Sequence, residues 1–357
     1  MPRARCRDVI TGISAFLWVA TTACGTDSGA PVTEDATPTG ASDAAPPSAA
    51  TTPGRVARDA GDAAPASDAG LGAADAGPSS AAKCFQSLTG PVKGPDYDQF
   101  HPVVQGGCAG THHQTITGVE KVVFLGDSIT EGTPPSLSAQ FYRTLLGQRL
   151  VQKFGPIEIA DCAAWGARMD DLLAGKGEIA KCFPTGVEQK RTLILMTNGG
   201  NDISTWAKNK LGPEAAAVEA DTAAGLFRDA MTWLKDPAHF LKGSYAVFTN
   251  AYEYTDSSGD LASCPAAPLS GIKGTWPEGA TAVVHFQEQI MKVAVETGTD
   301  MVFLLEDFCG HGYKKDDPTL QCYRGPNTER WFDVTCVHPN PLGHAEIAKL
   351  FAEVIDG

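Results

Sequence analysis

Basic residues are scarce in this sequence relative to acidic ones. Among 357 residues there are 28 Lys and Arg against 42 Asp and Glu, which gives a formal net charge of −14 at pH 7 and a pI near 5.0. Nucleic-acid binding depends on clustered Lys and Arg side chains, and the sequence contains no such cluster. Nucleic acid is therefore excluded as an expected partner. The net negative charge is otherwise interpreted as favouring solubility, and it does not indicate a substrate.

The amino-terminal apolar run is too short to span a bilayer. It covers residues 9–20, about a dozen positions, and follows a positive start at Arg3, Arg5 and Arg7. We therefore predict that residues 1–24 are a signal peptide, which implies an exported protein.

Small residues lead from this run to Cys24, as in a bacterial lipobox, where the Cys takes the lipid and becomes the new amino terminus. We expect Cys24 to be lipidated. Gly25 stands where an Asp would retain the protein at the inner membrane, so the expected place is the outer membrane or cell surface. Because Thr21 stands where Leu is usual, ordinary cleavage and free secretion is the alternative.

Residues 25–83 lack aromatic side chains entirely. Of these 59 residues, 52 are Ala, Pro, Ser, Thr, Gly or Asp. A segment of this composition cannot bury enough apolar surface to offset its ordering entropy, so we predict a disordered linker. Such a linker has a typical reach of roughly 40 Å, so it would keep the following domain at a distance from the membrane. The lipid anchor would be the only attachment of the protein to that membrane.

No CxxC spacing occurs among the ten cysteines, which argues against a zinc site, although several His lie close to Cys in the sequence. Setting aside the two in the amino-terminal region leaves eight, an even number that suggests disulfides in an exported chain. Their pairing cannot be deduced; the neighbouring pairs Cys84–Cys108 and Cys162–Cys182 are guesses. Residues 84–118 are interpreted as a disulfide-pinned lead-in.

From residue 119 onward, short apolar runs alternate with stretches of helical spacing. Strands are predicted at 121–125, 157–160, 192–196, 245–249 and 301–305, and helices at 137–153, from 169, at 213–234, 280–297 and 341–355. Apolar strands that alternate with helices imply a parallel sheet covered on both faces. We predict an α/β fold over residues 119–357: a flavodoxin-like three-layer α/β/α sandwich with a five-stranded parallel sheet.

A GxSxG nucleophile elbow is absent, so the α/β-hydrolase layout is not supported. Instead, the segment GDSIT follows the first predicted strand and places Ser128 at the carboxyl edge of the sheet, where ligands bind. Gly166 follows the second strand, Asn201 follows the third within NGGND, and His338 lies just before the last helix. One such Ser often only caps a helix, but four segments can converge on one edge.

These four residues have the chemistry of an acyl-transfer site. A Ser hydroxyl is a weak nucleophile at neutral pH and needs an adjacent base, and His has a suitable pKa. Ser128 would attack an ester carbonyl with His338 as its base. The backbone N–H groups of Ser128 and Gly166 and the side-chain amide of Asn201 would donate to the oxyanion.

In this order, GDSIT, the Gly166 segment, GGND and HPNPLGH resemble the four blocks of the SGNH (GDSL-type) hydrolase family. The resemblance covers about residues 119–357. It implies the flavodoxin-like sandwich, hydrolysis of carboxylic or lipid esters, and no metal cofactor. It also implies Ser128 as nucleophile, Gly166 and Asn201 as oxyanion donors, and His338 as base.

One position departs from the family pattern. The family usually has Asp three residues before the His, and here Thr335 stands there, with Asp333 two residues earlier. We expect a bulge at Cys336 to bring Asp333 back to the His338 ring; the alternatives are that a backbone carbonyl orients the ring, or that Asp333 only caps a turn. An orienting acid fixes the imidazole tautomer without taking the proton, so its loss would weaken the enzyme and not abolish it.

The sequence thus predicts an exported serine carboxylic ester hydrolase that acts through an acyl-enzyme on a small-molecule or polysaccharide ester. Two alternatives remain open. One is an acyltransferase that passes the acyl group to a sugar hydroxyl, and the other is a surface lipoprotein that binds glycan without catalysis. The complete set of Ser, Gly, Asn and His positions argues against the second alternative.

Overall fold

The computed structural model describes residues 109–174 and 177–357. The predicted signal peptide, the lipidation site Cys24, the linker 25–83, most of the lead-in 84–118 and the Cys84–Cys108 pair lie outside the described residues. Within the described part, none of the helices combines the length and the apolar character that crossing a bilayer requires.

A five-stranded parallel sheet forms the centre of the fold, in the order β2-β1-β3-β4-β5. Its strands are β1 (Lys121–Gly126), β2 (Glu158–Asp161), β3 (Thr192–Thr197), β4 (Ser244–Thr249) and β5 (Asp300–Val302). Every residue of β1 and β3 is buried, as expected for inner strands of a sheet covered on both faces. This order is the flavodoxin-like one, and the predicted fold is confirmed.

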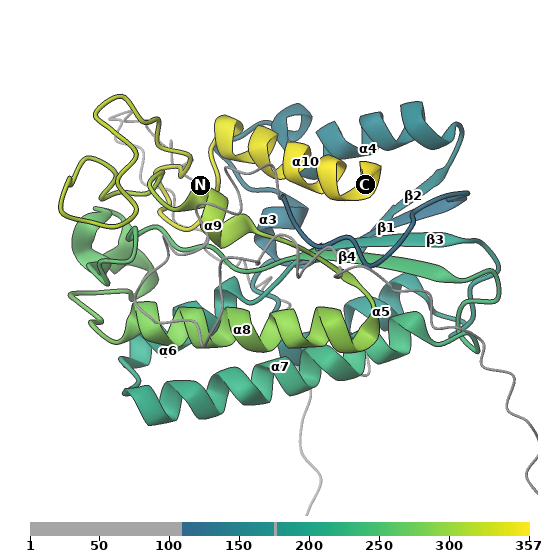
Figure 1. The fold of residues 1–357 in the computed structure, drawn as a ribbon, viewed down its shortest axis with the longest axis horizontal. Helices are drawn as coiled ribbons and strands as arrows, with labels where there is room; N and C mark the ends of the chain where they lie inside the picture. Colours follow the sequence, from purple (N-terminus) through teal and green to yellow (C-terminus); the bar gives the residue numbers. More distant parts are fainter. Residues whose placement is uncertain (1–108, 175–176) are drawn as a thin grey trace, which may run out of the picture. The chain divides into compact units, whose positions relative to one another are not determined.

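Helices cover both faces of the sheet (Figure 1). Helices α4 (Tyr142–Phe154) and α10 (Pro341–Asp356) pack together on one face, and α7 (Pro213–Lys235) and α8 (Gly279–Thr297) pack together on the other. Pro213 occupies the first turn of α7, where its missing N–H leaves no hydrogen bond unmade. The three layers place the carboxyl ends of all the strands at one edge of the sheet.

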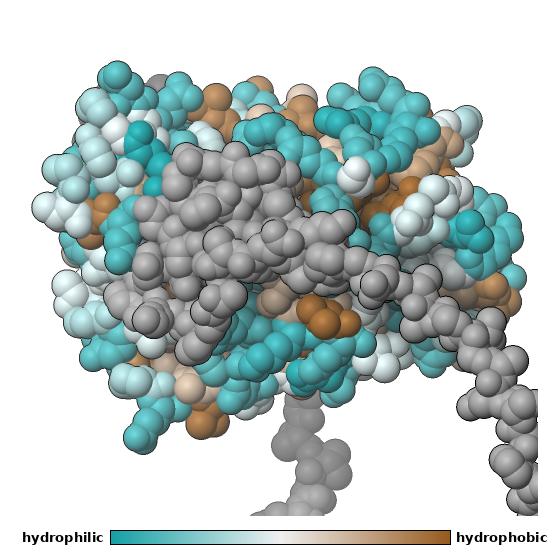
Figure 2. Space-filling view, in the orientation of Figure 1, coloured by the Kyte–Doolittle hydropathy of each residue, from teal (hydrophilic) through white to brown (hydrophobic). Residues whose placement is uncertain are grey.

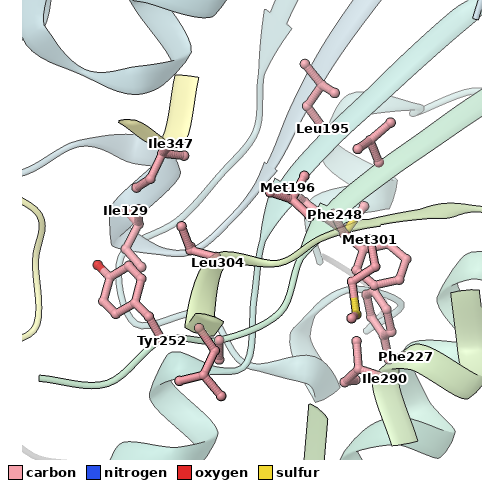
Figure 3. Close-up of a cluster of buried hydrophobic side chains, with 14 of the residues drawn as sticks. Ile129, Leu195, Met196, Phe227, Phe248, Tyr252, Ile290, Met301, Leu304 and Ile347 are labelled. Carbon is pink, nitrogen blue, oxygen red and sulfur yellow. The ribbon is translucent and has the colours of Figure 1, made fainter. Parts of the chain in front are cut away.

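The core is apolar on both sides of the sheet. Phe227 of α7 and Ile290 of α8 lie beside Phe248 of β4, whereas Ile347 of α10 lies on the side of Ile129 (Figure 3). The rings of Phe227 and Phe248 meet edge to face, with centroids 4.6 Å apart. Each fully buried side chain of this size contributes about 1.5–3 kcal/mol to stability.

The predicted strand 301–305 is wrong in its second half. Strand β5 ends at Val302, and a short helix, α9 (Leu304–Phe308), begins two residues later. The backbone N–H of Leu305 donates to Asn250 Oδ1 at 2.8 Å, which holds the first turn of α9 against the end of β4. A short apolar run can be buried as strand or as helix, so its pattern alone does not distinguish the two.

Three other elements differ from the prediction. The helix predicted at 137–153 is divided, because Phe141 is extended (φ −63°, ψ 138°) between the 3₁₀ turn Ser138–Gln140 and α4. The stretch from 169 forms only the 3₁₀ turn Met169–Asp171. Helix α6 (Gly200–Asn209) is additional: its buried Ile203, Trp206 and Ala207 stand at helical spacing, but they are few in a mostly polar segment.

Three disulfides tie the loops of the described part. They are Cys162–Cys182, Cys264–Cys336 and Cys309–Cys322, which close segments with sequence separations of 20, 72 and 13 residues. The guessed Cys162–Cys182 pair is confirmed. On the coloured part of the face shown in Figure 2, hydrophilic residues predominate and apolar ones form scattered groups.

Candidate active site

The turn after β1 presents the nucleophile candidate. Gly126 ends the strand with φ 116°, and a Cβ there would lie 2.3 Å from the carbonyl oxygen of Thr197, so only glycine fits. Asp127 caps the short helix α3 (Ser128–Glu131), which begins at the nucleophile candidate. Ser128 therefore stands at the carboxyl edge of the sheet, as the sequence predicts.

His338 meets Ser128 although 210 positions separate them in the chain. Its Nε2 lies 2.8 Å from Ser128 Oγ. The segment that carries His338 runs back on itself, with an antiparallel bridge between Phe332 and Pro339. Asn340 then caps α10, which fixes the imidazole relative to a long helix of the fold.

The imidazole of His338 is weakly basic. Burial disfavours the imidazolium and lowers the pKa of His338 to about 4. The ring is therefore neutral at pH 7, which is the state that a general base needs before it accepts the serine proton.

Thr335, not Asp333, contacts the second nitrogen of His338. Thr335 Oγ1 lies 2.7 Å from His338 Nδ1 and donates to Asp333 Oδ1 at 2.6 Å. The expected direct contact of Asp333 with the ring is thus corrected: a hydroxyl lies between them. The physical reason is the tight turn, in which the N–H of Thr335 also donates to Asp333 Oδ1, at 2.7 Å.

The backbone turns at Cys336, but the turn does not bring Asp333 into contact with the His338 ring as expected. Cys336 has φ 78°, a left-handed conformation unusual for a non-glycine residue, and its disulfide to Cys264 holds it in place. Two tyrosine hydroxyls fasten the same segment, because Tyr313 donates to the carbonyl of Asp333 at 2.6 Å and Tyr252 to that of Val337 at 3.0 Å. The backbone around His338 is therefore held from several sides.

The oxyanion-donor candidates Gly166 and Asn201 lie on adjoining loops. The amide of Asn201 donates to the carbonyl of Ala167 at 2.9 Å, next to Gly166. A primary amide carries two N–H groups, so the second can serve a ligand. The N–H of Ala164 donates to the carbonyl of Gly126 at 2.9 Å, which ties the Gly166 loop to the nucleophile turn.

Two buried aspartates brace these loops. Asp127 Oδ1 accepts the N–H of Ile129 at 3.0 Å and the hydroxyl of Thr197 at 2.9 Å. Asp202 accepts the N–H of Met169 and the Nε of Arg168, both at 3.2 Å. Burial raises the pKa of each aspartate to about 6. Both aspartates therefore hold the loops around Ser128 and Asn201 in place.

Sequence reasoning missed Glu178 and the direct contact of Thr335. The Glu178 side chain is buried under the nucleophile turn and accepts the N–H of Gly126, and burial raises the pKa of Glu178 to about 8. Nothing in the local sequence marks it. The sequence singles out Thr335, which stands three residues before His338 where the family usually has Asp, but it does not show which groups the hydroxyl contacts.

Trp165 is exposed beside the site. Its side chain is 64% exposed, and its indole N–H donates to the carbonyl of Gly132 at 3.2 Å, which fixes the ring over the end of α3. Among residues 109–174 and 177–357, no group of three or more His, Cys, Asp and Glu side chains is arranged to hold a metal ion.

A model of the GDSL-like Lipase/Acylhydrolase family matches residues 124–346. No curated protein matches the sequence. Among solved structures, a gut microbial diltiazem-metabolizing enzyme is 17% identical with a TM-score of 0.48, over 68% of this chain and 49% of that one. An acetyl xylan esterase is 18% identical with a TM-score of 0.43, over 66% of this chain and 99% of its own.

A phospholipase A1 from Streptomyces albidoflavus is 16% identical with a TM-score of 0.45, again over 66% of this chain and 99% of that one. The chain thus spans about half the length of the first of these structures. Likeness at such low identity is a likeness of fold, and it carries no inference about substrate.

Proposed function

Because the chain belongs to the GDSL-like lipase/acylhydrolase family, we propose that it is a serine carboxylic ester hydrolase with Ser128 as nucleophile and His338 as base. The observation that carries the proposal is the 2.8 Å contact between Ser128 Oγ and His338 Nε2. That distance is within hydrogen-bond reach, which is the first requirement for a nucleophile and its base.

In the first half of the reaction, Ser128 Oγ attacks the ester carbonyl carbon and its proton passes to His338 Nε2. The carbonyl oxygen becomes an oxyanion. The backbone N–H groups of Ser128 and Gly166 and the amide of Asn201 donate to it, and each such donor typically contributes about 2.7–4 kcal/mol. His338 then gives its proton to the departing alcohol oxygen, which leaves an acyl-enzyme on Ser128.

In the second half, water attacks the acyl carbon and loses its proton to His338. The new oxyanion uses the same donors, and the collapse of the intermediate returns the proton to Ser128 Oγ and releases the carboxylic acid. Each half-reaction begins and ends with a neutral imidazole. The lowered pKa of His338, about 4, supports this role because it keeps the ring unprotonated between turnovers.

The proposal also covers the cellular location of the protein and the class of its substrate. The positive start, the short apolar run and Cys24 support export and lipidation of the protein, with the outer membrane or cell surface as its location. The exposed indole of Trp165, held at the carboxyl end of the helix that begins with Ser128, offers a flat apolar surface. Such a surface suits the ester of a small molecule or of an acylated polysaccharide.

The test is Ser128→Ala, assayed against a chromogenic ester series from acetyl to long-chain acyl and against acetylated xylan. We expect wild type to release a burst of alcohol and the variant to lose turnover, with an unchanged thermal unfolding curve. Wild-type-like activity in Ser128→Ala would refute the mechanism. A wild type that releases no alcohol but retains glycan would favour the binding alternative, and acyl transfer to an added sugar would favour the transferase.

A further inference from the structure

We infer that Thr335 is the positioning residue of the catalytic base, and that Asp333 acts on His338 only through the Thr335 hydroxyl. The inference rests on the proposed function, because it assigns a role within that mechanism. The family pattern places a carboxylate directly at this ring nitrogen, and here a neutral hydroxyl occupies that place.

The carboxyl group of Asp333 fixes the direction of the two hydrogen bonds that link Asp333, Thr335 and His338. Asp333 Oδ1 already accepts the backbone N–H of Thr335 at 2.7 Å, so this oxygen is an acceptor and the Thr335 hydroxyl donates to it, over 2.6 Å. A hydroxyl has a single proton, so its oxygen is then an acceptor toward His338 Nδ1, 2.7 Å away. The proton of the neutral ring must therefore sit on Nδ1.

This arrangement leaves the lone pair of His338 on Nε2, which faces Ser128 Oγ at 2.8 Å. The hydroxyl thus selects the one tautomer in which the imidazole can accept the serine proton. When that proton arrives, Nδ1–H continues to donate to Thr335, and the Asp333 carboxylate lies one hydroxyl away from the new positive charge. No proton moves along the chain of contacts.

The surroundings of Asp333 support a role beyond capping a turn. Its side chain is 5% exposed, and Oδ2 has no hydrogen-bond partner among the described residues. Burial of a carboxylate is costly unless it is compensated, and here both donors come from Thr335. Burial raises the pKa of Asp333, and the two hydrogen bonds from Thr335 oppose that rise, so the carboxyl group is directed at the side chain that contacts His338 Nδ1.

Other titratable groups lie around the imidazole. His344 of α10 is buried, and its pKa, which burial lowers, is lowered further by His338. Tyr252 reaches the segment from the end of β4, and Arg330 acts on Asp333 from the same segment. Within the described part of the chain, the hydrogen-bond partners of the two ring nitrogens are the hydroxyls of Ser128 and Thr335.

The key variant is Thr335→Val, which removes the hydroxyl and keeps both the shape and the backbone N–H that donates to Asp333. We expect kcat to fall about 100-fold with little change in KM, because the ring loses its orientation and no substrate contact is lost. Thr335→Ser should retain most of the activity. Thr328→Val is the matched control, because its hydroxyl donates only to the carbonyl of Gly325, at 3.0 Å, within the preceding loop.

Two further variants test the Asp333 part. Asp333→Asn should give an activity between those of wild type and Thr335→Val, because an amide can offer Thr335 either an acceptor or a donor. The double variant Asp333→Asn with Thr335→Asp puts the carboxylate directly on Nδ1. We expect it to remain active and to move the acidic limb of the pH–rate profile upward by about one to three pH units.

The outcomes separate this inference from the proposed function. If wild type hydrolyses esters and Ser128→Ala does not, the function stands whatever the Thr335 variants do. Wild-type kcat in a folded Thr335→Val would then overturn the positioning role. Wild-type kcat in Asp333→Asn, beside a loss in Thr335→Val, would overturn the part assigned to Asp333.

Discussion

In the proposed mechanism, His338 acts as the base without a directly bonded carboxylate, and this affects the pKa of the imidazole. A carboxylate at Nδ1 stabilises the imidazolium and raises the pKa of a histidine, whereas a neutral hydroxyl provides a dipole only. Burial then dominates and lowers the pKa of His338 to about 4. Such a base is weaker in each proton transfer but remains unprotonated in acidic surroundings where an ordinary histidine would be charged.

The first prediction concerns the pH dependence of wild-type hydrolysis. Below the pKa of His338 the ring is protonated and cannot accept the serine proton, so kcat/KM falls as pH falls through that value. We expect the acidic limb to have its midpoint near pH 4, the pKa that burial imposes on His338.

The measurement is kcat/KM for a neutral, soluble ester from pH 3.5 to 8, with circular dichroism at each pH to show that the protein stays folded. A midpoint near 6.5, the ordinary value for histidine, would contradict the assignment.

At this scale the sequence predicted two residues that the fold brings together, Ser128 and His338. Ser128 and His338 could be found because each lies within a local pattern, after a strand or before a helix, that the fold brings to one edge. Thr335 stands out as a departure but not as a partner of His338, because a threonine hydroxyl accepts or donates and its role depends on the groups on either side. Glu178 could not be found, because its contact with the N–H of Gly126 depends on the packing of α5 (Glu178–Cys182) under β1, which the local sequence does not show.

At the scale of elements, the strands were easier to predict than the segments that connect them. Four of the five predicted strands lie within a residue or two of the observed ones. Three of them, β1, β3 and β4, are inner strands, which are buried along almost their whole length and therefore contain continuous apolar runs. The run 301–305 failed because β5 is an edge strand that pairs over only three residues with β4 before the chain turns into α9. Tertiary contacts, such as that of Leu305 with Asn250, decide where such a strand ends.

The segment 332–339 is the element on which the base depends, and its disulfide should matter more for activity than for folding. Cys264–Cys336 closes a sequence separation of 72 residues and Cys309–Cys322 one of 13. Chain entropy alone gives stabilisations of about 4 and about 3 kcal/mol, a small difference. Only the first disulfide, however, holds the segment that carries His338, because Cys336 lies between Thr335 and His338 in the chain.

We therefore predict that the double variant Cys264→Ser with Cys336→Ser loses at least about tenfold in kcat/KM under conditions where it is still folded, because small misplacements of a base are costly. The double variant Cys309→Ser with Cys322→Ser is the comparison and should retain most of its kcat/KM. Steady-state kinetics below the unfolding temperature of both variants makes the measurement. Equal losses in the two would mean that Cys264–Cys336 stabilises the fold without positioning the base.

At the scale of the whole molecule, many carboxyl groups are buried, and burial favours their neutral form. Burial raises the pKa of Glu178 to about 8 and that of Asp256, Glu306 and Asp307 to about 7. A raised pKa means that the fold holds protons that the unfolded chain has released. The stability from these groups is fully present at acidic pH, below their unfolded pKa, and is lost as pH rises through the folded values. Buried histidines act in the opposite sense, but only between about pH 6.5 and 4.

The interval from pH 6.5 to 8 therefore isolates the carboxyl groups, and Glu178 should contribute the most there. Its Oε1 has no hydrogen-bond partner among the described residues, which suits a neutral carboxylic acid better than a carboxylate. A group with a folded pKa of about 8 should cost the fold about 1–2 kcal/mol over this interval.

Glu178→Gln mimics the neutral form and still accepts the N–H of Gly126, so its free energy of unfolding should fall less than that of wild type between the two pH values. Glu214→Gln, on the exposed first turn of α7, is the matched control. Guanidinium unfolding at pH 6.5 and 8 measures the three proteins, and an equal fall in wild type and Glu178→Gln would show that Glu178 does not titrate between these pH values.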